Sequence, residues 1–266
     1  MSGFVEELRK SIQGDVYDSP AVKGMYSTDA SVYQIMPLAV VCPQHEQDVI
    51  ETLRIARSHK IPILARGGGT SLAGQTVAEA IVLDFSKYMN SILELDDHEV
   101  IVQPGVIRHQ LNHFLQPKGL VFAPDPATST RATVGGMIAN NSSGTKSILY
   151  GKTSDHVLEL KMLLHDGTII RTYPLNAEEL QQKLQSQDPD GEYYKQLLNI
   201  VLPLGEEVKL RYPKTMRRVG GYAFDDFLTS GCGDLNRIII GSEGTLGIIL
   251  EAKLKLVELP KYKGVS

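Results

Sequence analysis

Residues 123–151 constrain the fold of this chain more than any other stretch. They are rich in Gly, Ser, Thr and Asn, yet the middle of the stretch is apolar. Thr133 is typical of a helix N-cap, and apolar residues follow it at helical spacing: Val134, Met137 and Ile138. Gly135 and Gly136 then fall in the first helical turn, where glycine costs about 1 kcal/mol relative to alanine. We expect free N–H groups there to face an anion; the alternative is tight packing of a glycine-rich connection.

A second glycine-rich loop, residues 66–75, lies between two apolar segments predicted to be strands. It is not a Rossmann fingerprint, because Leu72 stands where the next glycine is required. It is not a Walker A motif either, because it lacks a Gly-Lys pair. Successive N–H groups with two hydroxyls and one arginine favour an anion-binding nest; a flexible surface loop is the alternative.

Two weaker motifs do not predict a site. Gly151-Lys152-Thr153 resembles the end of a Walker A motif, but Lys146 occupies the position of the required glycine. His109 and His113 are spaced as zinc ligands on a predicted helix, but no third ligand accompanies them. A solvated helix face is the favoured interpretation of the two histidines, and no metal is expected.

Periodicity predicts a mixed α and β chain. Helices are expected at 4–12, 46–59, 107–117, 176–187, 193–210 and 223–228. Strands are expected at 38–41, 61–65, 80–85, 92–95, 99–103, 157–164, 168–172, 237–240 and 246–256. Residues 13–36 are expected to be irregular, residues 188–191 and Pro203 to interrupt the helical region, and Phe114 to face inward.

Composition limits the function classes. A chain of 266 residues forms one large domain or two small ones, and its net charge of -4 gives no reason to expect nucleic acid. No apolar run is long enough to cross a bilayer, and residues 1–12 do not resemble a signal peptide. With only Cys42 and Cys232 present, we expect a reducing, cytoplasmic setting.

Three segments together resemble a known superfamily: residues 66–75, 124–151 and 241–249, with a Gly-Tyr pair at 221–222 before the last. They are similar to the flavoenzymes of the vanillyl-alcohol oxidase and p-cresol methylhydroxylase superfamily. Within it, the chain most resembles the FAD-linked dehydrogenases of D-lactate, glycolate and D-2-hydroxyglutarate. The runs at 124–133 and 150–156 favour the large bacterial members that carry iron–sulfur modules. The resemblance covers roughly residues 36–260.

This resemblance implies an α+β fold with two α/β subdomains of the PCMH type and FAD between them. The expected division is an N-terminal helical or irregular segment at 1–35, subdomains at 36–90 and 91–260, and a tail at 261–266. Family members continue into a cap domain that supplies substrate-binding groups. Because this sequence stops at Ser266, we expect the FAD-binding part of a longer protein, with the cap domain absent.

The resemblance also implies which residues contact FAD. The first loop would wrap the pyrophosphate with Arg66, Gly67, Gly68, Gly69, Thr70, Ser71, Gly74 and Gln75. The central stretch would contribute Pro124, Asp125, Ser129, Thr133, Val134, Gly135, Gly136, Asn140, Ser142, Gly144, Tyr150 and Gly151. The adenine-ribose end would be held by Glu243, Gly244, Ile248 and Ile249. Members with covalent FAD often carry histidine where this chain has Thr70, so we expect non-covalent FAD.

The implied activity is oxidation of a 2-hydroxy acid with hydride transfer to FAD. The electron acceptor would be an iron–sulfur module, a quinone or a cytochrome, and a peripheral site at the inner membrane stays open for a longer parent protein. No catalytic residue is assigned. The candidates near substrate are His156, Tyr222 and Arg217, for each of which a structural role is the alternative. Two other functions stay open: an electron-transfer subunit that holds FAD, and an NAD(P)H-dependent reductase of the same fold.

Overall fold

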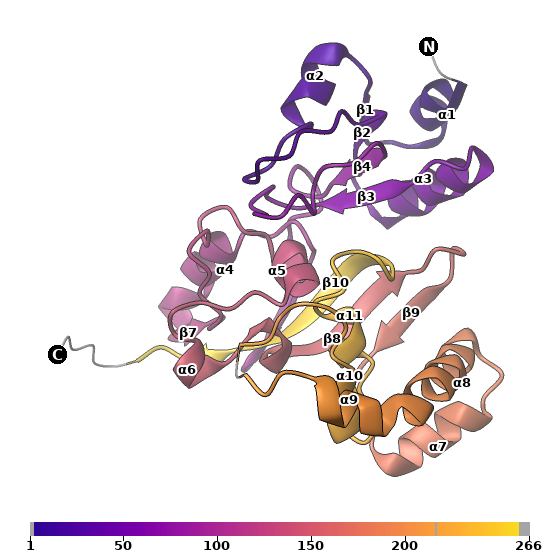
Figure 1. Cartoon of the computed structure of the whole chain (residues 1–266). Helices are drawn as coiled ribbons and strands as arrows, with labels where there is room; N and C mark the ends of the chain where they lie inside the picture. Colours follow the sequence, from indigo (N-terminus) through magenta and orange to yellow (C-terminus); the bar gives the residue numbers. More distant parts are fainter. Residues whose placement is uncertain (1–2, 216, 261–266) are drawn as a thin grey trace.

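The computed structural model describes residues 3–215 and 217–260, which form two units, each built on a β-sheet (Figure 1). The sheet of the first unit has the strand order β1-β2-β4-β3. Its strands are β1 (Asp15–Tyr17), β2 (Ala39–Cys42), β3 (Ile63–Arg66) and β4 (Ile81–Asp84). Its helices are α1 (Gly3–Ser11), α2 (Pro20–Met25) and α3 (Glu46–Ser58). Strands β2, β4 and β3 run parallel, and β1 pairs antiparallel with β2 at the edge.

The second unit is built on an antiparallel sheet in the order β5-β6-β10-β8-β9. These strands are β5 (Ile92–Asp96), β6 (Glu99–Val102), β8 (Val157–Leu163), β9 (Ile169–Thr172) and β10 (Ile248–Lys255). A separate small pair joins β7 (Leu120–Val121) to β11 (Val257–Glu258).

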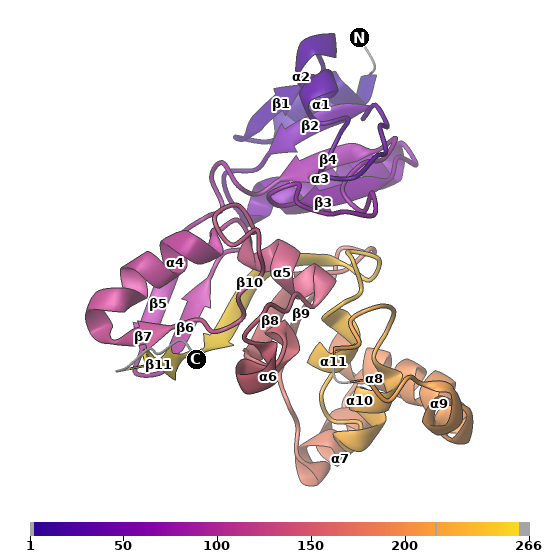
Figure 2. The same cartoon turned by 60° about the vertical axis from the view of Figure 1, so that its left-hand side comes forward.

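Eight α-helices and three short 3-10 turns belong to the described part of the second unit. The helices are α4 (Arg108–Leu115), α5 (Val134–Asn140), α6 (Ser147–Tyr150), α7 (Ala177–Gln185), α8 (Pro189–Val201), α9 (Gly205–Arg211), α10 (Phe224–Thr229) and α11 (Asn236–Ile239). The 3-10 turns are η1 (Gln116–Lys118), η2 (Thr153–Asp155) and η3 (Leu202–Leu204). Figures 1 and 2 both place α5 at the boundary between the two units. None of the helices described is long and apolar enough to span a bilayer.

Most predicted strands and helices are confirmed, but the segment at 237–240 is not a strand. It forms helix α11 and the residue after it. Ile238, Ile239 and Ile240 are all buried, and a short apolar run of this kind cannot distinguish a buried strand from a buried helical turn. The side chain of Asp234 favours the turn, because it accepts a hydrogen bond from the N–H of Asn236 at 3.1 Å.

Three further expectations are corrected. Residues 13–36 contain β1 and α2, which are too short to reveal a period. The break expected at 188–191 is instead the start of α8, because Asp188 caps the helix and Pro189 occupies its first position. Phe114 is exposed, because Leu111 and Leu115 form the inward face of α4. The interruption expected at Pro203 is confirmed by η3.

Strand β10 takes part in both hydrophobic cores. Ile248 and Leu250 pack with α1, α3 and the first sheet, whereas Ala252 and Leu254 pack in the core of the second unit. A register shift against β8 lies between Ile249 and Glu251, and it accompanies this change of core. The two units therefore share an apolar contact, which brings the loop after β3 close to the start of α5.

Candidate cofactor site

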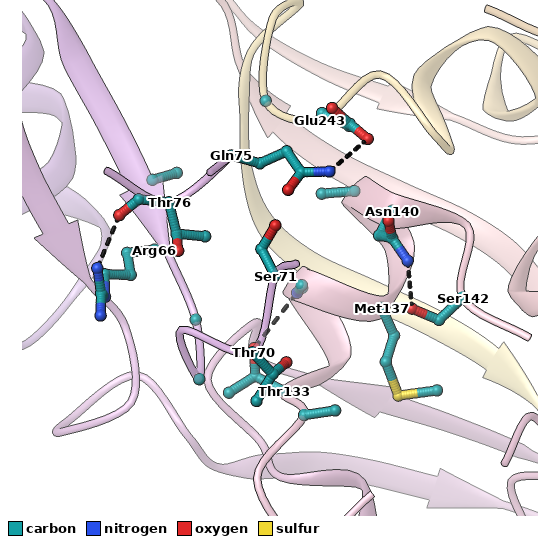
Figure 3. Close-up of a pocket in the computed structure, with 18 of the residues that line it drawn as sticks. Arg66, Thr70, Ser71, Gln75, Thr76, Thr133, Met137, Asn140, Ser142 and Glu243 are labelled. Atoms are coloured by element: carbon teal, nitrogen blue, oxygen red, sulfur yellow. Dashed lines mark hydrogen bonds between the residues drawn. The ribbon is translucent and has the colours of Figure 1, made fainter. Parts of the chain in front are cut away.

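A cavity of about 560 Å³ lies where the two units meet, a size typical of small-molecule sites (Figure 3). Three segments supply most of its lining: the loop after β3, the stretch around α5, and the turn before β10. The structure thus brings together three regions that are far apart in the sequence. The predicted residues that line the cavity are Arg66, Gly67, Gly68, Gly69, Thr70, Ser71, Gln75, Thr133, Gly135, Gly136, Asn140, Ser142, Glu243, Gly244 and Ile249.

Other predicted residues do not line this cavity: Gly74, Pro124, Asp125, Ser129, Val134, Gly144, Tyr150, Gly151 and Ile248. Val134 and Ile248 are buried in the two cores. The Asp125 carboxylate is instead ion-paired with Arg108 at 2.8 Å and with Lys146 at 3.5 Å. A Cβ on Gly144 would lie 1.8 Å from the carbonyl oxygen of Asp125, so close packing accounts for this glycine.

The loop after β3 presents consecutive unpaired N–H groups. No described residue accepts a hydrogen bond from the N–H groups of residues 67–71, and the buried Oγ of Ser71 has no partner in the described structure either. Glycine is required at two of these positions because the loop packs against its neighbour. A Cβ on Gly67 would lie 2.1 Å from Oγ1 of Thr133, and a Cβ on Gly68 would lie 2.2 Å from the carbonyl oxygen of Arg131. Of the two glycine-rich segments, this loop is therefore a stronger candidate for anion binding than the start of α5.

The start of α5 differs from the sequence-based expectation of free N–H groups. Val134 donates to the carbonyl of Val106, and Gly135 donates to the carbonyl of Pro104, both at 2.8 Å. Gly136 donates to Oγ1 of Thr133 at 3.3 Å, which confirms the predicted N-cap. The expectation is wrong because residues distant in sequence supply the acceptors for Val134 and Gly135. Tight packing explains Gly135, whose Cβ would lie 2.7 Å from Cβ of Pro104.

The opposite wall is tied to the loop by one hydrogen bond. Nε2 of Gln75 donates to Oε1 of Glu243 at 3.1 Å, as Figure 3 shows. Glu243 has a φ of 53°, a conformation that glycine adopts more readily, and its N–H donates to the carbonyl of Ala139 in α5 at 2.9 Å. Loop, helix and turn are therefore connected around the cavity.

Sequence reasoning missed several lining residues. Most are small or apolar side chains without a chemical motif, such as Ala30, Met137, Met162 and Val219. The sequence pattern places Met137 only in the apolar stripe of α5. Only the fold brings these residues to the cavity, because Ala30 comes from the N-terminal segment and Met162 from β8.

The three residues considered for substrate contact do not line the cavity. His156 is 5% exposed, and its Nε2 lies 2.7 Å from the carbonyl oxygen of Tyr150. The hydroxyl of Tyr222 lies 2.8 Å from Oγ1 of Thr245, and Arg217 is exposed. The surroundings of His156 and Tyr222 favour structural roles.

The two histidines with zinc-like spacing are not part of a larger cluster of potential ligands in the part of the chain that the structure describes. No group of three potential ligands among His, Cys, Asp and Glu is found there. His109 and His113 are both exposed on α4, which agrees with the favoured interpretation of a solvated helix face.

Comparison with known proteins assigns the family. The family described as "FAD binding domain" matches residues 37–173, just over half of the chain, and the chain belongs to this family. FAD is accordingly its cofactor. The resemblance drawn from the three segments to the PCMH-type fold and to the FAD-linked hydroxy-acid dehydrogenases is confirmed.

Individual relatives agree with this assignment. The chain is 39% identical over 266 residues to D-2-hydroxyglutarate dehydrogenase of Pseudomonas putida, an alignment that covers 97% of this chain and 26% of the relative. It is 36% identical over 251 residues to glycolate oxidase subunit GlcD of Bacillus subtilis, covering 92% of this chain and 43% of the relative. It thus spans about a quarter of the D-2-hydroxyglutarate dehydrogenase and less than half of GlcD.

Solved structures support the fold. An alkyldihydroxyacetonephosphate synthase superposes with a TM-score of 0.68 at 21% sequence identity, covering 97% of this chain and 41% of the other. At this identity the likeness concerns the fold alone.

The lining of the cavity fits FAD. The diphosphate requires hydrogen-bond donors, and the N–H groups of residues 67–71 together with Oγ of Ser71 are donors without partners. The ring systems require apolar walls, which Met137, Met162 and Ile249 supply. The ribose hydroxyls require acceptors, and the Glu243 carboxylate offers one at the far wall.

Proposed function

We propose that this chain binds FAD non-covalently and forms the FAD-holding part of a dehydrogenase that oxidises a 2-hydroxy acid of the D-2-hydroxyglutarate, glycolate or D-lactate type. One observation carries the proposal: consecutive unpaired N–H groups at residues 67–71 border a cavity of about 560 Å³ between the two units. The substrate class is supported by the 39% sequence identity to D-2-hydroxyglutarate dehydrogenase, in an alignment that covers 97% of this chain.

Each segment receives a role in this proposal. Residues 67–71 bind the diphosphate, Gly136 and Asn140 contact the middle of the cofactor, and Glu243 holds the ribose of the adenosine. Bound FAD supplies the hydride-accepting chemistry. The residues of this chain bind and orient it and keep water from one of its faces. Subdomains at 36–90 and 91–260 are the division that we propose.

Two further parts of the proposal concern chemistry outside the cavity. The resemblance matches Thr70 to the position where family members with covalent FAD often carry histidine, so no side-chain bond to FAD is expected there. Electrons leave to an iron–sulfur module, a quinone or a cytochrome. No residue of this chain is assigned as the catalytic base.

The first test is the visible spectrum of the purified chain, before and after acid precipitation. A flavin spectrum with FAD released into the supernatant supports the proposal, whereas colour retained in the pellet contradicts non-covalent binding. If the protein is colourless, FAD is added and its fluorescence quenching is titrated. A folded protein that binds no added FAD contradicts the proposed site.

A matched pair of variants locates the binding. Ser71→Ala removes the unpaired hydroxyl, and we expect FAD affinity to fall by about tenfold or more, the value of a hydrogen bond to a charged group. Ser91→Ala is the control, because Ser91 is exposed and does not line the cavity. Equal affinities for the two variants would place the diphosphate elsewhere.

The activity is tested anaerobically on the FAD-loaded protein. Anaerobic bleaching of the flavin by one of the three 2-hydroxy acids supports the substrate class. Bleaching by NADPH alone supports the reductase alternative. Bleaching by neither, with reduction only through a partner protein, supports the electron-transfer alternative.

A further inference from the structure

The side chain of Arg66 is used inside the protein. Nη1 donates to the carbonyl of Thr76 at 2.7 Å and to that of Tyr26 at 3.4 Å, and Nη2 donates to the carbonyl of Thr28 at 2.8 Å. The guanidinium also lies over the ring of Tyr26, 5.4 Å from its centre. Figure 3 shows the side chain turned toward Thr76 and away from Ser71.

The acceptors of Arg66 belong to two segments of the chain, one before and one after the loop that follows β3 (residues 67–75). Thr76 directly follows the loop, and Tyr26 and Thr28 belong to residues 26–33, which we call the N-terminal strap. Arginine suits this arrangement, because its planar fork directs several donors at fixed angles, whereas a lysine ammonium is a compact point charge. Arg66 therefore links the strap to both ends of the loop.

The strap makes further contacts with the loop. The N–H of Ala30 donates to the carbonyl of Gly69 at 3.2 Å, and Oγ1 of Thr76 donates to Oδ2 of Asp29 at 2.9 Å. The ring of Tyr33 lies against Gly74, where a Cβ would come within 2.6 Å of it. The strap thus holds the outer side of the loop and leaves the N–H groups of residues 67–71 without internal partners.

The strap is itself anchored to the first sheet. The hydroxyl of Tyr26 donates to Oδ2 of Asp84, the last residue of β4, at 2.6 Å. Asp84 is 7% exposed and also accepts a hydrogen bond from the N–H of Ser86 at 2.7 Å. Burial lowers the pKa of Arg66, although the nearby carboxylates of Asp84 and Asp29 oppose this shift. The positive charge of Arg66 is thus balanced within the protein.

We propose that Arg66 and Asp29 are positioning residues that set the shape of the FAD-binding loop, and that Arg66 is not a ligand of the diphosphate. The inference rests on the proposed function, because it assigns the loop to the diphosphate. In this proposal the N-terminal strap is part of the cofactor site, although its sequence contains no motif that predicts such a role.

The test is FAD affinity, measured by fluorescence quenching at several salt concentrations. A direct phosphate contact requires the charge, so Arg66→Lys would keep much of the affinity, and Arg66→Gln would lose affinity and flatten its salt dependence. A positioning role instead requires the planar guanidinium of arginine, with its several donors at fixed angles. We expect Arg66→Lys and Arg66→Gln to weaken FAD binding alike, by about tenfold or more, with the salt dependence of the wild type.

Asp29→Asn provides a test in which the two roles predict opposite signs. Removing a negative charge beside an anion site tightens FAD binding if only charge matters. If Asp29 positions the loop, the same change weakens binding, and we expect a loss of about threefold or more because a charged acceptor for Thr76 and Ser31 is replaced. Asp97→Asn is the matched control, because Asp97 lies in the turn between β5 and β6, has a φ of 45° that asparagine tolerates, and does not line the cavity.

The outcomes separate the two proposals. A folded wild-type chain that binds no FAD overturns the proposed function. A wild type that binds FAD, combined with a tight Arg66→Lys variant or with tighter binding in Asp29→Asn, overturns the positioning role alone. If the Arg66 variants do not fold, as judged by circular dichroism, the Asp29 and Asp97 pair decides the question.

Discussion

The loop at residues 67–71 and the start of α5 look alike in sequence and differ in structure. Both are glycine-rich, and both border the cavity. The N–H groups of the loop have no acceptor in the described structure, whereas those of Val134, Gly135 and Gly136 all have one. Glycine therefore serves two purposes here. In the loop it permits close packing that leaves donors available, and at the helix start it permits packing in which the donors are used.

This difference assigns separate tasks to the two regions. The loop provides donors that a bound anion can use, and α5 provides a fixed wall against which the loop packs through Thr133. Substitutions in the loop should therefore affect FAD affinity first, and substitutions at the start of α5 should affect stability first.

The largest expected effect comes from Gly68→Ala. The added methyl would lie 2.2 Å from the carbonyl oxygen of Arg131, so the loop must move away from the segment before α5. We expect FAD affinity to fall by about a hundredfold, equivalent to about 2.7 kcal/mol, and the free energy of unfolding to fall by about 1–3 kcal/mol. Fluorescence titration and urea unfolding measure the two quantities. Gly205→Ala is the control, because nothing lies within 4 Å of its Cβ position; equal behaviour of the two variants would contradict the packing argument.

Thr133→Val tests the helix. It removes the acceptor of the Gly136 N–H while keeping the side-chain volume, and loss of such a cap costs about 1–2 kcal/mol of unfolding free energy. Thr133→Ser retains the hydroxyl and should restore most of this stability in urea unfolding. A Val variant as stable as the wild type would show that the cap contributes nothing. A Val variant that instead binds FAD more tightly would show that the released N–H serves the cofactor.

The sequence allowed much of the fold to be predicted. The Thr133 cap, the apolar stripe of α5 and most strands of both sheets follow from local periodicity and are confirmed. The predicted strand at 237–240 failed because a buried run of isoleucines has no period that separates helix from strand. The local hydrophobic pattern thus predicts a helix or strand well where only one of its faces is buried, and poorly where all of its faces are buried.

The site was less predictable, for a different reason. The acceptors for Gly135 and Val134 are carbonyls of Pro104 and Val106, which are about thirty residues earlier in the chain. Two acceptors of Arg66 lie within residues 13–36, for which the sequence pattern predicts irregular structure. A motif identifies which residues meet at the site, but whether their donors are available depends on contacts that only the tertiary structure supplies.

Lowering the pH should reduce the contribution of the loop region to the free energy of unfolding and leave that of the α5 cap unchanged. Burial raises the pKa of Asp29, but hydrogen bonds from Ser31 and Thr76 outweigh it and hold the pKa below its usual value. A lowered folded-state pKa stabilises the protein fully above about pH 4, and this contribution is lost as the pH falls through the folded-state pKa. We expect a contribution of less than about 1 kcal/mol, because the carboxylate is partly exposed.

Urea unfolding between pH 6 and pH 3 measures this contribution. Asp29→Asn should lose less stability on acidification than the wild type, whereas Thr133→Val should follow the wild-type pH dependence, because a hydroxyl cap does not titrate. Parallel pH curves for Asp29→Asn and the wild type would remove Asp29 from the account of the loop.

The smallest expected effect concerns the bond that connects the two regions. Gln75 closes the loop, and its amide donates to Glu243, whose own N–H is held by Ala139 of α5. Gln75→Met keeps the length of the side chain and removes this donor, together with the Oε1 acceptor of the Ala73 N–H. Because the pair is exposed, stability should change by less than about 0.5 kcal/mol, but FAD should dissociate about two to five times faster, since the bond crosses the wall of the cavity.

Stopped-flow displacement of FAD measures the dissociation rate. Gln47→Met is the matched control, since Gln47 makes a similar exposed hydrogen bond to Glu51 on α3.

Combining Gln75→Met with Thr133→Val shows whether the two regions act independently. Additive effects on the free energy of unfolding and on FAD dissociation would keep the tasks of loop and helix separate. A large coupling would mean that α5 reaches the cofactor through Glu243, so that the distinction between a binding loop and a supporting helix would have to be abandoned.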